Sequence, residues 1–163
     1  MSILVYHGSV DIVKSPKYDC GRENLDFGRG FYVTDNEQQA ENWALSQQQR
    51  FNKTPIINVY QLQQDEILST MKCRIFRNYD LEWMEFIIAN RNGIVQTERY
   101  DYIEGGVAND RIINSIKLYM QGYLSQEATL RNLSMHRPNN QICLSTQTTI
   151  DKYLHYEYSR ELQ

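Results

Sequence analysis

The sequence predicts an α+β domain in which the strands pair mainly antiparallel. The chain has 163 residues, a length that fits one domain over residues 1–163. Its hydrophobic content of 41% is normal for a globular protein with a real core. Strand-like and helix-like segments follow one another without regular alternation, so a doubly wound parallel sheet is not expected.

Two short strands separated by a long loop are expected at the start of the chain. Residues 2–8, SILVYHG, read as a strand that ends at a glycine. Residues 11–30 contain Pro16 and three of the eight glycines, a composition that predicts an irregular loop. Residues 31–34, FYVT, then predict the second strand.

The next elements are a helix and two strands. A helix is expected over residues 37–51, where apolar residues recur at helical spacing, with Thr34 or Asp35 as its N-cap. Residues 56–62, IINVYQL, give the best strand signal because they are rich in β-branched side chains. Residues 72–76, KCRIF, predict a further short strand.

The second half of the chain predicts three helices and three strands. In order, they are a helix over residues 80–91, a strand over 100–107, a helix over 111–123 that Asp110 caps and Gly122 helps to end, a helix over 126–133 that Ser125 caps, and strands over 141–146 and 153–159. Serine and aspartate favour N-caps because their side-chain oxygens accept hydrogen bonds from free backbone N–H groups.

Charge and composition narrow the function classes. The net charge of -3 does not give the overall basic footprint of a general nucleic-acid binder, although a local basic groove remains compatible with it. No apolar run is long enough to span a bilayer, so a cytoplasmic protein without membrane contact is expected. The three cysteines have unrelated spacings and are expected to be reduced and mostly buried. The three histidines are far apart, so no metal site is expected.

Two N-terminal segments carry the candidate site residues. His7 ends the first strand and is followed by Gly8, whose missing side chain would let a ligand approach the backbone. Tyr32 and Trp43 are eleven residues apart and could stack on a flat heterocycle from the two sides of one cleft. Taken singly, His7 is expected to be a half-buried histidine at a turn, and Tyr32 and Trp43 are expected to be core aromatics.

Taken together, YHGS and GFYVTDN resemble the ADP-ribosyltransferase superfamily, in particular its diphtheria-toxin-like branch with a His-Tyr-Glu core. Trp43 occupies the place of that branch's second stacking aromatic. The longer stretches LDFGRGFYVTDNEQQAENWA, EWMEFIIANR, YDYIEGGVAND and NNQICLST are also similar to an uncharacterised bacterial group of this superfamily. Members of that group are often encoded beside small partner proteins, in a toxin–antitoxin manner.

The resemblance implies mainly antiparallel split sheets around a central NAD cleft, with flanking helices and no metal. It also implies roles for individual residues. His7 would hydrogen-bond the adenosine-side ribose, with Gly8 and Ser9 beside it, and the Gly8 backbone would bind the carboxamide. Tyr32 and Trp43 would stack the nicotinamide. Arg29 could pair with the pyrophosphate, because arginine matches phosphate geometry.

The third motif departs from the family pattern. Gln141, in NNQICLST, stands where the family has its catalytic glutamate. An amide can still hydrogen-bond the ribose, but it cannot supply the negative charge that stabilises an oxocarbenium-like transition state. Three alternatives follow: Gln141 suffices, another acid such as Glu104 or Asp110 supplies the charge, or the domain binds its ligand without turnover.

The expected function is therefore NAD-dependent mono-ADP-ribosyl transfer by a bacterial toxin or effector, with a protein or nucleic acid as acceptor and a cognate antitoxin protein as partner. The alternative is a catalytically blunted NAD-binding or protein-interaction domain on the same scaffold. Within the resemblance, His7, Tyr32 and Gln141 are the candidate catalytic residues.

Overall fold

Two β-sheets and six helices make up the fold in the computed structural model, which describes residues 1–163. The strands are β1 (Ile3–Ser9), β2 (Phe31–Val33), β3 (Ile56–Leu62), β4 (Cys73–Ile75), β5 (Tyr102–Gly106), β6 (Asn140–Leu144) and β7 (Leu154–Glu161). The helices are α1 (Glu37–Phe51), α2 (Gln64–Thr70), α3 (Leu81–Arg91), α4 (Asp110–Met120), α5 (Gln126–Ser134) and α6 (Gln147–Tyr153).

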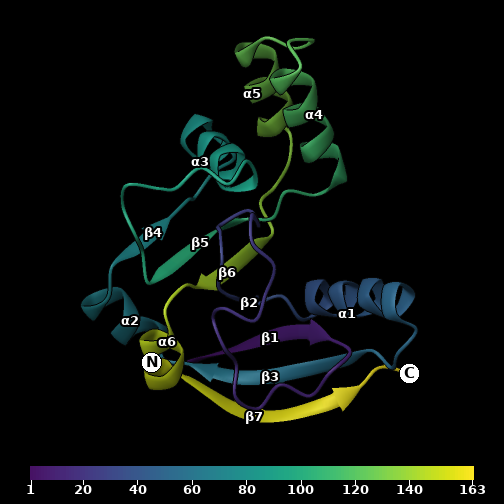
Figure 1. The fold of residues 1–163 in the computed structure, drawn as a ribbon, viewed down its shortest axis with the longest axis vertical. Helices are drawn as coiled ribbons and strands as arrows, with labels where there is room; N and C mark the ends of the chain where they lie inside the picture. The colour runs from purple at the N-terminus through teal and green to yellow at the C-terminus, as the bar shows by residue number, and fades with distance from the viewer.

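The strands form one three-stranded and one four-stranded sheet. The first has the order β1-β3-β7 and the second the order β2-β6-β5-β4. Every pair is antiparallel except β4 with β5, which is parallel and is connected through α3. In Figure 1 the three-stranded sheet lies below the four-stranded sheet, and the α4–α5 pair forms the top of the molecule. The α+β class with mainly antiparallel pairing is thus confirmed.

The two sheets meet at one backbone bridge and then separate. Tyr6 N–H donates to the Thr34 carbonyl over 2.8 Å, and Thr34 N–H donates back over 3.0 Å. Alternate residues of a strand direct their backbone groups to opposite edges, so Gly8 directs its N–H and C=O to the same edge as Tyr6. No strand pairs with that edge after Tyr6. The Gly8 backbone therefore faces the gap where the sheets diverge.

Three apolar clusters hold these layers together. The first lies between the sheets and contains Val5 and Tyr60 from one sheet and Ile142 from the other. The second lies on the opposite face of the four-stranded sheet, under α3, α4 and α5, with fully buried Trp83 at its centre. The third joins α1 to the outer face of the three-stranded sheet. The alternation of buried residues along each strand assigns neighbouring side chains to opposite clusters.

Most predicted elements are present, and the helix over residues 37–51 and the strand over 56–62 have the predicted bounds. Two N-cap predictions are wrong by one or two residues: Asn36 caps α1 and Asn109 caps α4. Both asparagines accept a hydrogen bond from the backbone N–H three residues on. Ser125 caps α5 as predicted.

Two further predictions need correction. The short helices α2 and α6 were not predicted, because each has only seven residues and no clear apolar period. The cysteines are all free, but only Cys143 is buried, whereas Cys20 is exposed and Cys73 is half-buried.

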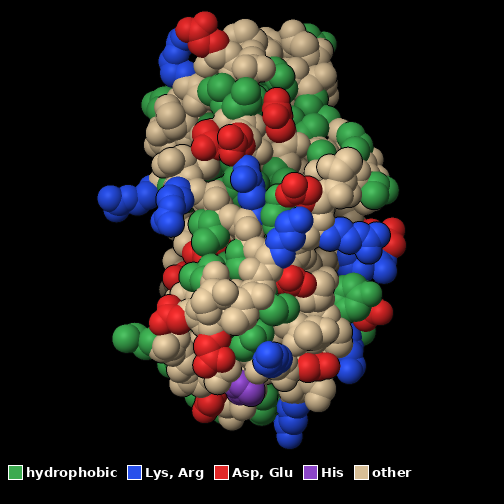
Figure 2. Space-filling view, turned by 90° about the vertical axis from the view of Figure 1, so that its left-hand side faces the viewer, with side chains coloured by type: hydrophobic (Ala, Val, Ile, Leu, Met, Phe, Trp, Pro, Cys, Tyr) green, Lys and Arg blue, Asp and Glu red, His purple; other side chains and the backbone are tan.

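Charge is unevenly distributed over the surface. On the face shown in Figure 2, which carries α2, α6 and β4, Lys and Arg side chains form a band at mid-height with carboxylates above and below it. A chain with negative net charge therefore still presents local basic surface. None of the six helices is both long and apolar enough to cross a membrane.

Candidate functional site

A cleft of about 820 Å³ opens where the two sheets diverge. It is lined by five of the residues that the sequence singled out: His7, Gly8, Tyr32, Trp43 and Gln141. They come from β1, β2, α1 and β6, which are far apart in the sequence. The fold thus brings the three separate sequence motifs to one place.

His7 links the two sheets at the base of the cleft. Its Nδ1–H donates to the backbone carbonyl of Tyr32 over 2.7 Å, and its ring lies 4.4 Å from the ring of Phe31. Burial lowers the pKa of His7 below 6.5, and the hydrogen bond to Tyr32 only partly opposes this. The imidazole is therefore neutral at pH 7, which leaves Nε2 as a hydrogen-bond acceptor.

Gly8 is required by the packing of α1 on β1. A Cβ atom at this position would lie 1.9 Å from the Ala40 carbonyl oxygen and 2.8 Å from the Ala44 nitrogen. The missing side chain therefore lets the helix approach the strand, and this corrects the expectation that it makes room for a ligand. The backbone N–H and C=O of Gly8 still face the cleft and have no strand partner.

Tyr32 is fixed at its hydroxyl by the loop that precedes it. The hydroxyl donates to the Gly28 carbonyl over 2.5 Å and accepts from the Phe27 N–H over 3.1 Å. Burial, with smaller contributions from Cys143 and Asp26, raises the pKa of Tyr32 well above 10, so the phenol stays neutral. The ring is half-buried and lines the cleft. Its orientation is thus set before any ligand arrives.

Trp43 belongs to a stripe of α1 that forms one wall of the cleft. Ser46, Gln47 and Arg50 follow it at helical spacing, and all of them line the cleft. Ala40 and Ala44 on the neighbouring face are completely buried against the sheet. The sequence pattern of α1 therefore separates a packing face from a cleft-facing stripe.

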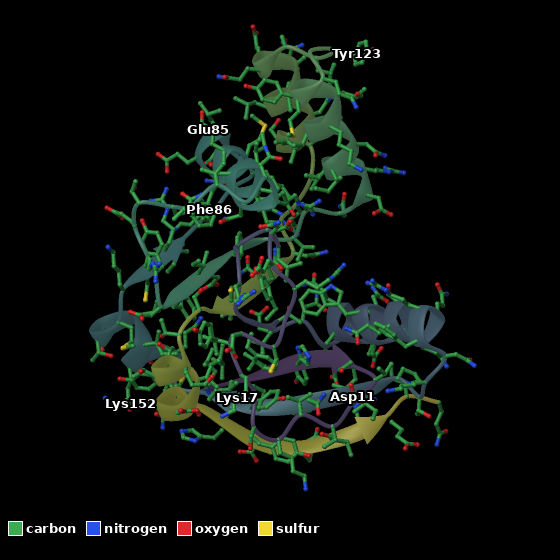
Figure 3. The ribbon with its side chains drawn as sticks, in the orientation of Figure 1. Asp11, Lys17, Glu85, Phe86, Tyr123 and Lys152 are labelled. Carbon is green, nitrogen blue, oxygen red and sulfur yellow. The ribbon has the colours of Figure 1, made fainter.

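The loop that follows β1 is held in place by buried polar groups of β3. Asn58 is completely buried and accepts from the Val13 N–H over 2.9 Å, while its own amide donates to the Asp11 carbonyl over 3.0 Å. The Tyr60 hydroxyl donates to the Val13 carbonyl over 2.6 Å. Figure 3 shows Asp11 and Lys17 on this loop, in front of the three-stranded sheet. Residues 10–15 therefore form an ordered wall.

The cleft is locally basic although the chain is acidic. Five cations and two carboxylates line it: Lys17, Arg22, Arg50, Lys53, Arg91, Asp11 and Asp26. Lys53 lies 3.9 Å from Asp11, and Arg91 contacts Asp26, so these four charges are paired. The other three cations make no ion pair within the protein. Their free charge favours an anionic ligand.

Gln141 faces the cleft beside an acid that the sequence did not single out. Gln141 is 5% exposed, and its Nε2 lies 3.5 Å from the Asp26 Oδ2. The Asp26 Oδ1 accepts from Arg91 Nε over 2.6 Å, and the Asp26 carbonyl accepts from Asn90 Nδ2 over 3.0 Å. Two neighbouring residues of α3 thereby hold Asp26 against the start of β6. A loop aspartate gives no sequence signal for this position.

Glu104 does not reach the cleft, because it lies on the other face of the sheet. It pairs with Ile142 in the β5–β6 register, whereas Gln141 pairs with Gly105. Its carboxylate accepts from the Tyr102 hydroxyl over 2.5 Å and from Asn140 Nδ2 over 3.1 Å. Glu104 is thus not a cleft acid.

Three more sequence candidates lie outside the cleft. Asp110 is an exposed residue in the first turn of α4. Ser9 is 6% exposed, and its hydroxyl accepts from the Asp11 N–H within the loop.

Arg29 pairs with Glu23 and lines a separate cavity of about 580 Å³ together with Phe27 and Phe86. Figure 3 shows Phe86 on the side of α3 that faces β4 and β5. Arg29 therefore lines a cavity other than the cleft.

The chain belongs to a family described as "Protein of unknown function (DUF3990)", whose model matches residues 3–156. No curated protein and no solved structure matches the chain. No group of three His, Cys, Asp or Glu side chains is arranged to bind a metal ion.

Proposed function

We propose that this protein is an NAD-dependent mono-ADP-ribosyltransferase related to the diphtheria-toxin-like branch. The observation that carries the proposal is the convergence of His7, Gly8, Tyr32, Trp43 and Gln141 on one cleft between two split sheets. The sequence alone names these residues as candidates, and their convergence in the structure supports the proposal independently. The split antiparallel sheets also agree with the fold that the resemblance implies.

The chemistry of the cleft matches the parts of NAD. Tyr32 and Trp43 offer aromatic rings for the flat nicotinamide, and the Gly8 N–H and C=O offer a complementary donor and acceptor for its carboxamide. Neutral His7 offers an acceptor for a ribose hydroxyl. The unpaired cations Arg22 and Arg50 offer charge for the pyrophosphate.

In the proposed reaction, the bond between the nicotinamide nitrogen and C1′ of its ribose breaks. The electron pair leaves with nicotinamide, which becomes neutral, and positive charge develops on the ribose C1′ and ring oxygen. A nucleophile of the acceptor bonds to C1′ and loses its proton to solvent. Rigid rings and fixed dipoles favour this path because they need no rearrangement while the charge develops.

The biological role we propose is that of a bacterial toxin or effector acting in the cytoplasm on a protein or nucleic-acid acceptor, with an antitoxin as partner. This part of the proposal depends on the resemblance to the toxin–antitoxin-associated group. The free cations of the cleft are compatible with both classes of acceptor, since either can present negative charge beside the modified residue.

The second candidate function is an NAD-binding or interaction domain without turnover, which Gln141 favours. Removing the carboxylate from the family's third motif removes the charge that would stabilise the cationic transition state. On this alternative, the wild-type protein binds NAD but does not release nicotinamide, whereas Gln141→Glu releases it.

The test combines NAD binding with nicotinamide release. Wild-type protein should bind NAD by calorimetry and release nicotinamide in the presence of cell extract, with labelled ADP-ribose appearing on an acceptor. Tyr32→Ala and His7→Ala should abolish release, while His155→Ala, an exposed histidine of β7, should not. If millimolar NAD neither binds nor raises the unfolding temperature, the proposal is wrong.

A further inference from the structure

We propose that Asp26 supplies the negative charge that Gln141 lacks, so that the two side chains together replace a single glutamate. This inference rests on the proposed function. The two groups face the same cleft from different elements, Asp26 from the loop before β2 and Gln141 from the start of β6. The carboxylate oxygen and the amide nitrogen lie 3.5 Å apart.

Burial distinguishes Asp26 from the other carboxylate of the cleft. The Asp26 side chain is 11% exposed, whereas that of Asp11 is 68% exposed. A charge acts more strongly on its surroundings when water is excluded from it, because the local dielectric constant is lower. Asp26 is therefore the more buried of the two cleft carboxylates, and its Oδ2 lies beside Gln141.

The neighbours of Asp26 fix its position. Arg91 binds Oδ1, and the Arg91 side chain is 40% exposed, so the cation covers the carboxylate from the solvent side. Asn90 holds the Asp26 backbone over 3.0 Å. The second oxygen, Oδ2, remains directed toward Gln141.

The amide of Gln141 is oriented by this contact. A carboxylate only accepts hydrogen bonds, so it selects the NH2 group of Gln141 as its neighbour. The Gln141 Oε1 has no hydrogen-bond donor within the protein and is left as an acceptor for a ribose hydroxyl. Gln141 then performs the positioning role of the family glutamate, and Asp26 performs the electrostatic one.

The proposed step uses the charge of Asp26 without any covalent change to it. As the bond from C1′ to the nicotinamide nitrogen breaks, the electron pair leaves with nicotinamide and the ribose becomes cationic. Asp26 lowers the free energy of that cation. Water, or the acceptor nucleophile, then bonds to C1′ and releases its proton to solvent, so Asp26 neither gains nor loses a proton in the reaction.

The test exchanges the acid and the amide between the two positions. Asp26→Asn should lower kcat for nicotinamide release about 100-fold, with the Kd for NAD changed less than about threefold. The double variant Asp26→Asn with Gln141→Glu keeps one acid and one amide and should recover kcat to within about tenfold of the wild type. Asp110→Asn makes the same change at an exposed position outside the cleft and should have no effect.

The single variant Gln141→Glu places two carboxylates in contact, and one of them will retain a proton. Its kcat should therefore rise less than about tenfold at pH 7, in contrast to the large gain expected if the cleft lacked an acid. Unfolding temperatures of all variants identify any change that merely reflects misfolding.

The outcomes separate this inference from the function on which it rests. If Asp26→Asn folds and releases nicotinamide at the wild-type rate, Asp26 has no catalytic role while the transferase function stands. Weaker NAD binding with unchanged kcat also overturns the inference, since Asp26 would then act in binding only. If Asp26→Asn does not fold, the double variant is the test. A folded double variant that does not recover kcat overturns the inference. Absence of NAD binding to the wild-type protein overturns both proposals.

Discussion

The His7 ring and the Tyr32 backbone are joined by a hydrogen bond of 2.7 Å that connects β1 of one sheet to β2 of the other. A backbone bridge also joins Tyr6, one residue before His7, to Thr34, two residues after Tyr32. The cleft opens directly beside these contacts. His7, proposed to contact the adenosine-side ribose, and Tyr32, proposed to stack the nicotinamide, are therefore fixed relative to one another by the junction of the sheets.

His7 should make the stability of the protein depend on pH. Burial lowers the pKa of His7 in the folded state below 6.5, so the unfolded chain binds a proton more readily as pH falls. The free energy of unfolding should decrease as pH drops through 6.5 toward the folded pKa, and the decrease should be smaller in His7→Asn. Urea unfolding at pH 7 and pH 5 measures this difference.

The matched control for this prediction is His155→Asn, which removes an exposed histidine of β7. The pH dependence of its unfolding should equal that of the wild type. An equal loss of pH dependence in both variants would show that the effect does not come from the buried position of His7.

Tyr32→Phe should separate the structural role of the hydroxyl from that of the ring. The substitution leaves the Phe27 N–H and the Gly28 carbonyl without their partner. We expect a loss of about 1–3 kcal/mol in the free energy of unfolding, because buried unpaired groups are costly. The ring remains, so nicotinamide release should fall less than about tenfold, whereas stacking and release are lost in Tyr32→Ala.

Chemical denaturation and steady-state kinetics on the same samples measure both effects. Tyr158→Phe is the control, because Tyr158 is 51% exposed on β7. A Tyr32→Phe variant as stable as the control would contradict the anchoring role of the two loop contacts.

The sequence predicted the elements that have long periodic patterns. The helix over 37–51 and the strand over 56–62 could be predicted because the spacing of apolar residues within each segment indicates its secondary structure. The caps Asn36 and Asn109 were missed because several polar residues adjoin each helix start, and only the backbone angles select one of them. The predicted residues of the cleft were found because they lie in compact local motifs.

What the sequence could not predict depends on contacts between distant segments. Asp26 lies in an irregular loop, and its position is set by Asn90 and Arg91, more than sixty residues away. Glu104 lies outside the cleft because of the strand register, since a shift of one residue places a side chain on the other face of the sheet. Neither fact has a local sequence signature.

Gly8→Ala should destabilise the protein strongly. The new methyl group would lie 1.9 Å from the Ala40 carbonyl oxygen, so α1 has to move away from β1. We expect a loss of about 3 kcal/mol or more in the free energy of unfolding, at the upper end of the usual cost of overpacking. Because Trp43 is on α1, NAD binding should weaken as well.

The control for Gly8 is Gly122→Ala. Gly122 has a φ of 82°, and a Cβ there would meet no atom within 4 Å. Only the left-handed backbone conformation should then be penalised, by about 1–2 kcal/mol, without an effect on NAD binding. Guanidinium unfolding curves for the two variants should differ clearly. Equal losses in the free energy of unfolding would show that α1 can move away from β1 at little cost.

Arg50 should contribute to NAD binding through charge. It follows Trp43 by two helical turns on the cleft wall and has no carboxylate partner. Arg50→Gln should raise the Kd for NAD about tenfold, because a charge-assisted hydrogen bond to phosphate contributes about 1.5–3 kcal/mol. Binding of free nicotinamide, which carries no phosphate, should be unchanged. Calorimetry at low and high salt measures the difference in Kd, which should shrink at high salt because ions screen exposed charges.

Arg131→Gln on α5 is the control, because the Arg131 side chain is 69% exposed, and it should leave both affinities at wild-type values. Equal losses for NAD and for nicotinamide would place the phosphate-binding cations elsewhere in the cleft, with Lys17 and Arg22 next to be substituted.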